Sequence, residues 1–314
     1  MATPANPNNH SDGMDTAITY RKLTMAERWN SQPLGLLAKL LFNSSAGKSK
    51  PLGPPNPVIA VCISDVHNLA PEITRGNVLI HVGSLSQDGS AVEIQRTLDW
   101  LSTQRHPVKV VIAGNRDYLL DSRLDGTKQY SPQQAAKLRS RLRWHDIIYL
   151  ENETATVTVS AAKGRQLKIF GSPYTPQNGH LAFQYPRHMD FWESQIPEDV
   201  DVLVTHGPPR AHLDGGYGCV YLLSALWRTR PRLHAFGQSP IGPLLTWLRF
   251  DSLQEAYENT VLYESYWFLL VTVFWWLRGW MGYGTSEPLT LAVNALISDE
   301  RRGKEDGKPA IVLI

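Results

Sequence analysis

The chain has 314 residues, of which 42% are hydrophobic and 19% are charged, and this balance excludes disorder of the whole chain. The formal net charge of +2 excludes an overall basic field, so we expect no nucleic-acid partner. Only two cysteines, Cys62 and Cys219, are present, which excludes a disulfide framework and favours a cytoplasmic location.

The first 57 residues are predicted to precede the main domain. Residues 1–15 are polar, lack the basic and apolar regions of a secretory signal, and predict a disordered tail. A mildly amphipathic pattern over residues 24–42, interrupted by Pro33 and Gly35, predicts two short helices or one broken helix. A linker rich in Ser, Gly and Pro follows. We expect the helical segment to pack on the domain surface, with a membrane or partner contact as the alternative.

Six short apolar runs rich in β-branched residues follow Pro57, and each ends in a small polar cluster. Runs of this length suit strands that are buried on both faces. Helical stretches such as 91–102 and 132–142 lie between them, so the chain is predicted to form a layered α/β domain over residues 58–314. Sites in such sheets form at the loops after the carboxyl ends of strands. The runs are 58–63, 78–82, 108–113, 167–170, 202–205 and 233–236.

Candidate metal ligands lie at the ends of three of these runs. Asp65 and His67 form an Asp-x-His pair, and an extended backbone places both side chains on the same side, where they can converge on one cation. Asn115 adds a side-chain carbonyl, and His206 adds an imidazole. Taken alone, the pair is better explained by loop hydrogen bonding, so the prediction of a site depends on the three clusters together.

The order of the clusters resembles the calcineurin-like metallophosphoesterase superfamily, in particular its fungal phosphoesterase-like branch and the animal metallophosphoesterase-domain proteins. The segments SDVHN, HVGSLSQDGS, VIAGNRD, KIFGSPYTP, VLVTHGPPRAHLD and RPRLHAFG carry the resemblance. It implies a four-layer α-β-β-α sandwich and a catalytic centre of two metals bridged by an aspartate. Carried over residue by residue, it implies metal ligands at Asp65, His67, Asn115 and His206.

Several positions depart from the pattern of the superfamily. Ser84 replaces the bridging aspartate, Arg116 replaces the histidine that protonates the leaving group, and Gln238 and Pro240 replace two further histidines. Adjacent divalent cations repel one another unless anionic groups lie between them. We therefore expect a degraded site that binds no cofactor or a single divalent cation, Mn, Fe or Zn.

The remaining groups still predict acid-base chemistry. His67 or His206, oriented by Asp65, would move a proton of a substrate near neutral pH. Arg116 stays protonated, so it would bind an anionic group or pair structurally with Asp65 or Asp117. The predicted catalytic residues are His67, Asp65, His206 and Arg116. The predicted substrate-binding residues are Arg116, Asn115, Ser84, Gln238, Trp267 and Trp275.

Residues 241–288 are predicted to be an aromatic, mostly helical insert. Trp267, Trp275, Trp276 and Trp280 fall within one short stretch, and the run 266–277 is apolar apart from Thr272. This run is shorter than the about 20 residues that cross a bilayer. Three interpretations stay open: a helix that completes the core, a hydrophobic wall over the pocket, and a peripheral membrane contact through residues 261–284.

These features favour an enzyme of the metallophosphoesterase fold that is repurposed for an apolar small molecule. The expected reaction is an isomerisation, dehydration or cyclisation in a fungal-type pathway of secondary metabolism, by metal-free or single-metal acid-base chemistry. The alternatives are a weak metal-dependent phosphoesterase and a non-catalytic scaffold.

Overall fold

The structure is a computed structural model that describes residues 23–45, 56–66, 70–126, 130–239, 241, 244–281, 289–297 and 308–314. The predicted tail over residues 1–15 and most of the predicted linker lie outside these residues. One sheet has five strands in the order β13-β1-β2-β3-β4, in which β1 to β4 are parallel and β13 is antiparallel to β1. Its strands are β1 (Ile59–Ile63), β2 (Val78–Val82), β3 (Val108–Ile112), β4 (Ile147–Tyr149) and β13 (Ala310–Leu313).

A second sheet has six strands in the order β11-β12-β10-β9-β6-β5. Its four inner strands are parallel, and its two edge strands run antiparallel to their neighbours. The strands are β5 (Glu153–Val159), β6 (Arg165–Ser172), β9 (Val202–Thr205), β10 (Leu233–Phe236), β11 (Leu244–Leu248) and β12 (Thr290–Asn294). Two further segments, β7 (Thr175–Pro176) and β8 (Gln184–Tyr185), form a small parallel pair.

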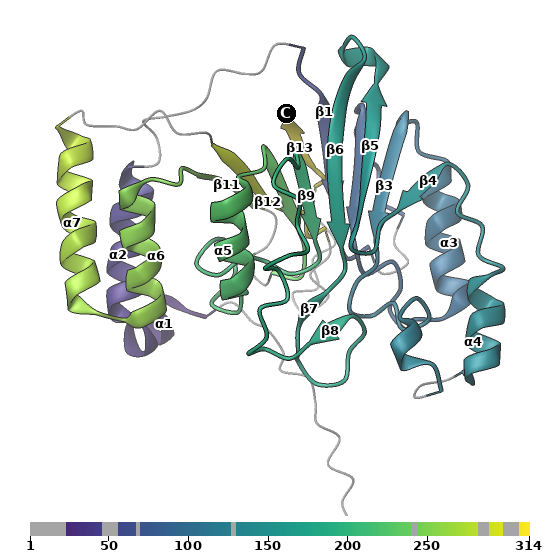
Figure 1. The fold of residues 1–314 in the computed structure, drawn as a ribbon, viewed down its shortest axis with the longest axis horizontal. Coiled ribbons are helices and arrows are strands. Elements are labelled where there is room, and N and C mark those ends of the chain that lie inside the picture. The colour runs from purple at the N-terminus through teal and green to yellow at the C-terminus, as the bar shows by residue number, and fades with distance from the viewer. Residues whose placement is uncertain are drawn as a thin grey trace, which may run out of the picture.

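The two large sheets pack face to face, and helices cover their outer faces (Figure 1). Apolar side chains such as Ile80 and Val204 fill the space between the sheets. Helix α3 (Ala91–Ser102) buries Ile94 and Leu98 on the first sheet, where α4 (Pro132–Arg139) also packs. Helix α5 (Val220–Thr229) buries Leu226 on the second sheet. This arrangement confirms the predicted four-layer α/β sandwich. Short 3₁₀ turns occur at η2 (Ser122–Leu124) and η3 (Ser160–Ala162).

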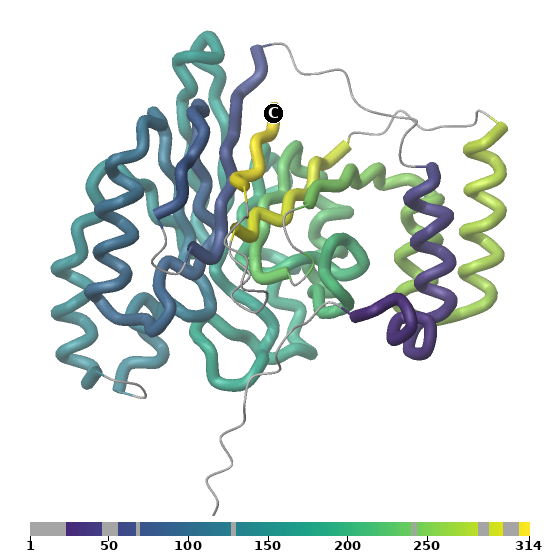
Figure 2. The backbone as a smooth tube through the Cα atoms, turned by 180° about the vertical axis from the view of Figure 1, so that it is seen from behind, coloured from purple at the N-terminus to yellow at the C-terminus, as the bar shows by residue number. Residues whose placement is uncertain are grey.

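A further helical layer lies beyond α5, where α2 (Pro33–Ser45), α6 (Ser252–Tyr263) and α7 (Tyr266–Trp280) pack together (Figures 1 and 2). A short helix, α1 (Met25–Ser31), ends just before Pro33, and proline suits the first turn of α2 because it has no amide hydrogen to donate. Of the two sequence alternatives, the structure thus has two helices. The N-terminal segment and the predicted insert form one layer, although they are far apart in sequence.

Contacts between α2 and the end of α6 explain this pairing. The Glu264 carboxylate accepts hydrogen bonds from the backbone amides of Leu34, at 3.1 Å, and Gly35, at 2.9 Å. A carboxylate at a helix N-terminus satisfies free amides and interacts favourably with the helix dipole. The ring of Phe42 stacks on Tyr257 with centroids 4.6 Å apart. Among the described residues, no helix is both long and apolar enough to cross a bilayer.

Candidate functional site

The loops after strands β1, β2, β3, β9 and β10 meet at one edge of the sandwich and bring five predicted site residues together. They are Asp65, Ser84, Asn115, His206 and Gln238. All are buried except the half-buried Gln238. His67 lies outside the described residues, so its predicted roles as ligand and acid-base group stay predictions. The half-buried Arg116 follows Asn115 directly, and its pairing with Asp65 or Asp117 also stays a prediction.

His206 is held in one tautomer by the backbone. Its Nδ1 lies 2.8 Å from the carbonyl oxygen of Val82, which can only accept, so Nδ1 carries the hydrogen. In the neutral ring, Nε2 then keeps a lone pair. This Nε2 lies 3.4 Å from Ser84 Oγ and 3.3 Å from Asn115 Oδ1. Nε2 of this fully buried imidazole can therefore accept a hydrogen bond from the Ser84 hydroxyl, whereas Asn115 Oδ1 faces it as a second lone-pair atom.

Asp65 joins the loop after β1 to the loop after β10. Its carboxylate accepts hydrogen bonds from the Ser64 hydroxyl and, at 3.3 Å, from the backbone amide of Gln238. Asp65, Ser84 and Gln238 all have left-handed backbone angles, with φ of 55°, 57° and 53°. Such strained conformations cluster at functional sites because the surrounding structure must enforce them.

Asp117 positions two of the site loops, a role that the sequence analysis missed. Its fully buried carboxylate accepts hydrogen bonds from the amides of Leu85, Ser86 and Gly114 at 3.1, 2.9 and 2.7 Å, and from the Ser86 hydroxyl at 2.6 Å. Burial raises the pKa of Asp117, and these hydrogen bonds oppose the rise. The donors come from the loops after β2 and β3, so Asp117 fixes Ser84 relative to Asn115. Its place in the GNRD cluster was the available signal.

Glycine allows the His206 ring to approach these loops closely. A Cβ atom built on Gly114 would lie 2.8 Å from His206 Cε1, and one built on Gly83 would lie 2.6 Å from His206 Nδ1. Gly83 also has a φ of 95°, which disfavours other residues. The two glycines therefore leave the space that the imidazole occupies.

Two lone-pair atoms of the site face each other across a short gap. His206 Nε2 and Asn115 Oδ1 are two lone-pair donors 3.3 Å apart, as expected for neighbouring ligands of one ion with bonds of about 2.1 Å. Ser84 offers a neutral hydroxyl where a bridged pair needs an anion. In the part of the chain that the structure describes, no three His, Cys, Asp or Glu side chains gather into a metal-binding group.

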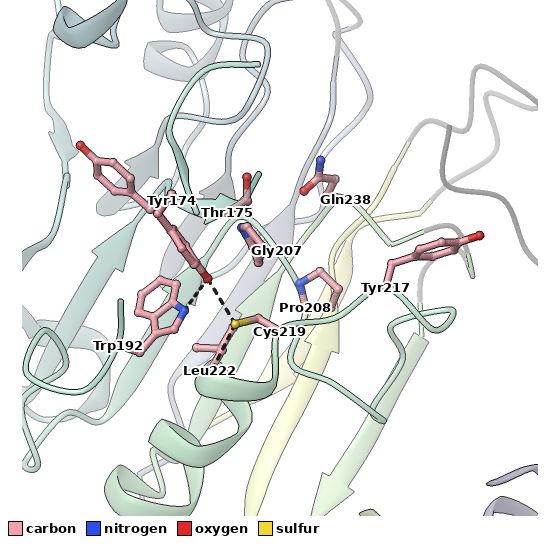
Figure 3. A pocket seen from close by; sticks show the side chains of 11 residues that line it. Tyr174, Thr175, Trp192, Gly207, Pro208, Tyr217, Cys219, Leu222 and Gln238 are labelled. Carbon is pink, nitrogen blue, oxygen red and sulfur yellow. Dashed lines mark hydrogen bonds between the residues drawn. The ribbon is translucent and has the colours of Figure 1, made fainter. Parts of the chain in front are cut away.

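A narrow aromatic cavity opens at the loop after β9 (Figure 3), and this loop begins with His206. Gly207, the next residue along the chain, lines it together with Gln238. Its aromatic walls are Tyr174, Tyr185, Trp192 and Tyr217. The cavity volume is about 20 Å³, room for one water molecule or one small substituent of a ligand.

The cavity walls are held by a chain of hydrogen bonds around Tyr185. Its hydroxyl accepts from Trp192 Nε1 at 2.9 Å and donates to Cys219 Sγ at 3.2 Å (Figure 3). Burial raises the pKa of Tyr185 far above its usual range. The lining residue Thr175 is buried, and its Oγ1 has no hydrogen-bond partner among the described residues. A ligand atom or a water in the cavity would satisfy this hydroxyl.

The structure does not bring Trp267 and Trp275 to this site. Both lie on α7, which packs on α2 and α6 and lines neither this cavity nor the wider hollow of about 530 Å³ beside β8. Chain connectivity placed the start of the insert near the site, but its helices fold away from it. Other aromatic residues, Tyr174 and Trp192 among them, line the cavity instead, and the KIFGSPYTP segment was the signal for Tyr174.

The chain is similar in sequence to several known proteins, and each match covers only part of this chain and part of the other protein. No family model matches the chain. The probable rhamnogalacturonate lyase C of Emericella nidulans is 39% identical over 274 residues, covering 85% of this chain and 25% of that protein. Metallophosphoesterase domain-containing protein 1 of Homo sapiens is 34% identical over 207 residues, covering 59% of this chain and 61% of that protein. A UPF0046 protein of Caenorhabditis elegans is 32% identical over 198 residues, covering 58% of this chain and 68% of that protein.

Among solved structures, phosphopantetheinyl hydrolase of Mycobacterium tuberculosis aligns with a TM-score of 0.45 and 15% identity, covering 82% of this chain and 97% of that one. The chain spans one quarter of the Emericella protein and 61% of the human protein.

Proposed function

Because the chain belongs to the UPF0046 family, whose relatives include metallophosphoesterase domain-containing proteins, we propose that it is an enzyme of that fold repurposed for a small molecule with an apolar part. The reaction is an acid-base isomerisation, dehydration or cyclisation. The lyase activity in the name of the Emericella relative is not proposed for this chain, which spans only 25% of that protein.

The observation that carries this proposal is the aromatic cavity at the loop that begins with His206. Gly207, which follows His206 in the chain, and Gln238, whose amide donates to Asp65, both line it. An apolar substituent seated between Tyr185 and Gly207 would hold the reacting atoms of the substrate next to His206. The small volume limits that substituent to a few atoms, so the rest of the substrate would extend out of the cavity.

His206 is the proposed acid-base group. Its Nε2 lone pair takes a proton from the substrate, and the Val82 carbonyl, which accepts from Nδ1, stabilises the imidazolium that forms. Asn115 Oδ1 then accepts the new Nε2 hydrogen. Returning the proton to another carbon completes an isomerisation, whereas giving it to a leaving hydroxyl releases water. The charge of Arg116 would favour an anionic group on the substrate.

Substrate turnover by variants tests this proposal. The purified chain is incubated with small-molecule extract of fungal mycelium, and consumed compounds are followed by mass spectrometry. We expect His206→Ala to abolish consumption and Asp65→Ala to reduce it, whereas His188→Gln, at an exposed position, leaves it unchanged. Full turnover by the Asp65→Ala, His67→Ala and His206→Ala variants would exclude acid-base catalysis at this site.

A second candidate is cation-dependent phosphoester hydrolysis, which the facing lone pairs of His206 Nε2 and Asn115 Oδ1 favour. Asp65 and His67 would complete the ligand set for Mn, Fe or Zn, and the bound ion would lower the pKa of a water ligand. Stoichiometric metal in the purified protein, with chelator-sensitive hydrolysis of p-nitrophenyl phosphate, would favour this candidate. Absence of both, and of turnover in extracts, would leave the non-catalytic scaffold.

We also propose a cytoplasmic role in fungal secondary metabolism. Cys62 and Cys219 are both buried free thiols, as expected in a reducing compartment. Burial raises the pKa of Cys62 to about 12, which keeps it an unreactive thiol. Genes that neighbour the locus in a fungal genome are the simplest check on the pathway.

A further inference from the structure

Helix α7 carries an exposed apolar face that packing of the core does not explain. Among the side chains of this helix, Thr272 is fully buried, whereas Trp267, Leu270 and Trp280 are 68%, 64% and 73% exposed. Exposed apolar patches of this kind mark interaction surfaces. The exposed large side chains, called the α7 outer face below, are Tyr266, Trp267, Leu270, Phe274, Leu277 and Trp280.

The opposite side of α7 is occupied by its neighbours in the helical layer. Trp276 Nε1 donates to Ser44 Oγ on α2 at 2.8 Å, and the hydroxyls of Thr272 and Thr260 lie 3.1 Å apart between α7 and α6. Trp275 packs on the apolar cluster of the same layer. These contacts fix which side of the helix turns inward and leave the α7 outer face toward solvent.

We propose that the α7 outer face docks on the surface of a lipid bilayer, with the helix lying in the plane of the interface. The helix has 15 residues, fewer than the about 20 that cross a bilayer. Around the helix, Trp280 and Trp267 lie at the two edges of this face, with Leu277, Leu270 and Phe274 between them. Amphipathic rings prefer the headgroup level, whereas the Leu and Phe side chains between them suit the acyl region.

The width of the face favours lipid over a second copy of this chain. At 100° per residue, the six side chains span about 140° of the helix circumference. A pair of helices buries a narrower strip, with two positions in each heptad. A second α7 would therefore leave part of the face in water, whereas a lipid surface covers all of it.

The charge of the segment indicates how the binding is driven. Residues 266–281 contain no Asp or Glu, and their one charged side chain, Arg278, lies over the ring of Trp275 at 5.2 Å. Attraction to anionic headgroups is therefore a small part of the binding, and burial of apolar area is the main part. Binding to phosphatidylcholine should persist at high salt.

Vesicle binding of the full chain tests the proposal. With phosphatidylcholine vesicles, the wild-type chain co-sediments, its tryptophan emission shifts to shorter wavelength, and about 0.5 M salt changes the partition less than about twofold. Phe274→Glu weakens the partition by at least about tenfold, because it places a charge in the apolar face. Val92→Glu, a matched change at a 68% exposed position on α3, leaves it unchanged. Circular dichroism and thermal unfolding show that both variants fold.

Three results would overturn the proposal. They are a wild-type chain that stays in the supernatant, a Phe274→Glu variant that partitions like the wild type, and a lipid-free dimer that Phe274→Glu converts to a monomer. The last would make the face an interface between two copies. The experiment uses no substrate, so its outcome is independent of the proposed catalysis.

Discussion

At the strand ends, Asp65, Ser84 and His206 are polar groups buried in the protein, whereas on α7 the apolar side chains of Trp267 and Leu270 face water. Buried polar groups are stable only while each hydrogen bond is made, so their positions tolerate little change. Exposed apolar groups have few neighbours, so substitutions there change stability little and change binding more. Substitutions should therefore lower the free energy of unfolding at the strand ends and leave it almost unchanged on α7.

At neutral pH, the largest expected effect is at Asp117. In Asp117→Asn, an amide group replaces one acceptor oxygen and faces a backbone donor of Leu85 or Ser86. We expect the free energy of unfolding to fall by about 2–4 kcal/mol, measured by urea denaturation. The matched change Glu198→Gln, at an exposed carboxylate, should shift it by less than about 0.5 kcal/mol. Equal effects of the two variants would show that Asp117 does not hold the site loops.

A pH dependence of stability is expected from His234 on β10. Burial lowers the pKa of this fully buried imidazole to about 3, so the unfolded chain binds its proton more readily between pH 3 and 6.5. The stabilisation is complete above about pH 6.5 and is lost as the pH falls, at up to about 1.4 kcal/mol per pH unit. Urea denaturation at several pH values measures this slope, and His234→Gln should flatten it. The same slope in wild type and variant would assign it to other groups.

The smallest effects are expected from replacing one glycine by alanine in each region, at the strand ends and on α7. In Gly114→Ala, the new Cβ would lie 2.2 Å from the Ser84 backbone nitrogen and 2.8 Å from the His206 ring, so we expect a loss of about 1–3 kcal/mol together with a loss of catalytic turnover. In Gly279→Ala, nothing lies within 4 Å of the Cβ, so the exposed helix should gain about 0.5–1 kcal/mol. Thermal unfolding of both variants checks the difference in sign. A loss at Gly279 would mean that α7 is packed more closely than its exposure indicates.

Apolar runs in the sequence predicted the inner strands of the fold well. The runs 58–63, 78–82 and 202–205 contain β1, β2 and β9, whose residues are buried almost throughout because both faces pack on other layers. The strand β5 was missed because it is an edge strand with mostly exposed positions. Continuous apolar patterns identify strands in the middle of a sheet, and edge strands lack them.

The site residues on strand ends were predictable for a related reason. Ser84, Asn115 and His206 each follow a parallel strand, and parallel strands end at a common edge. The location of α7 was not predictable, because connectivity fixes only where the helix begins. Asp117 was missed because its amide donors at Leu85 and Ser86 are over 30 residues away, so the GNRD cluster alone does not reveal them.

The contact between Glu264 and the start of α2 also bears on the order in which the protein assembles during synthesis. The hydrogen bond to the Leu34 amide joins residues 230 positions apart. At about 5–20 residues per second, a ribosome needs about 10–50 s to make the chain between them. During that time Phe42, whose ring later stacks on Tyr257, has no native partner on α6. The layer that contains α7 is therefore completed only after the ribosome has made most of the chain.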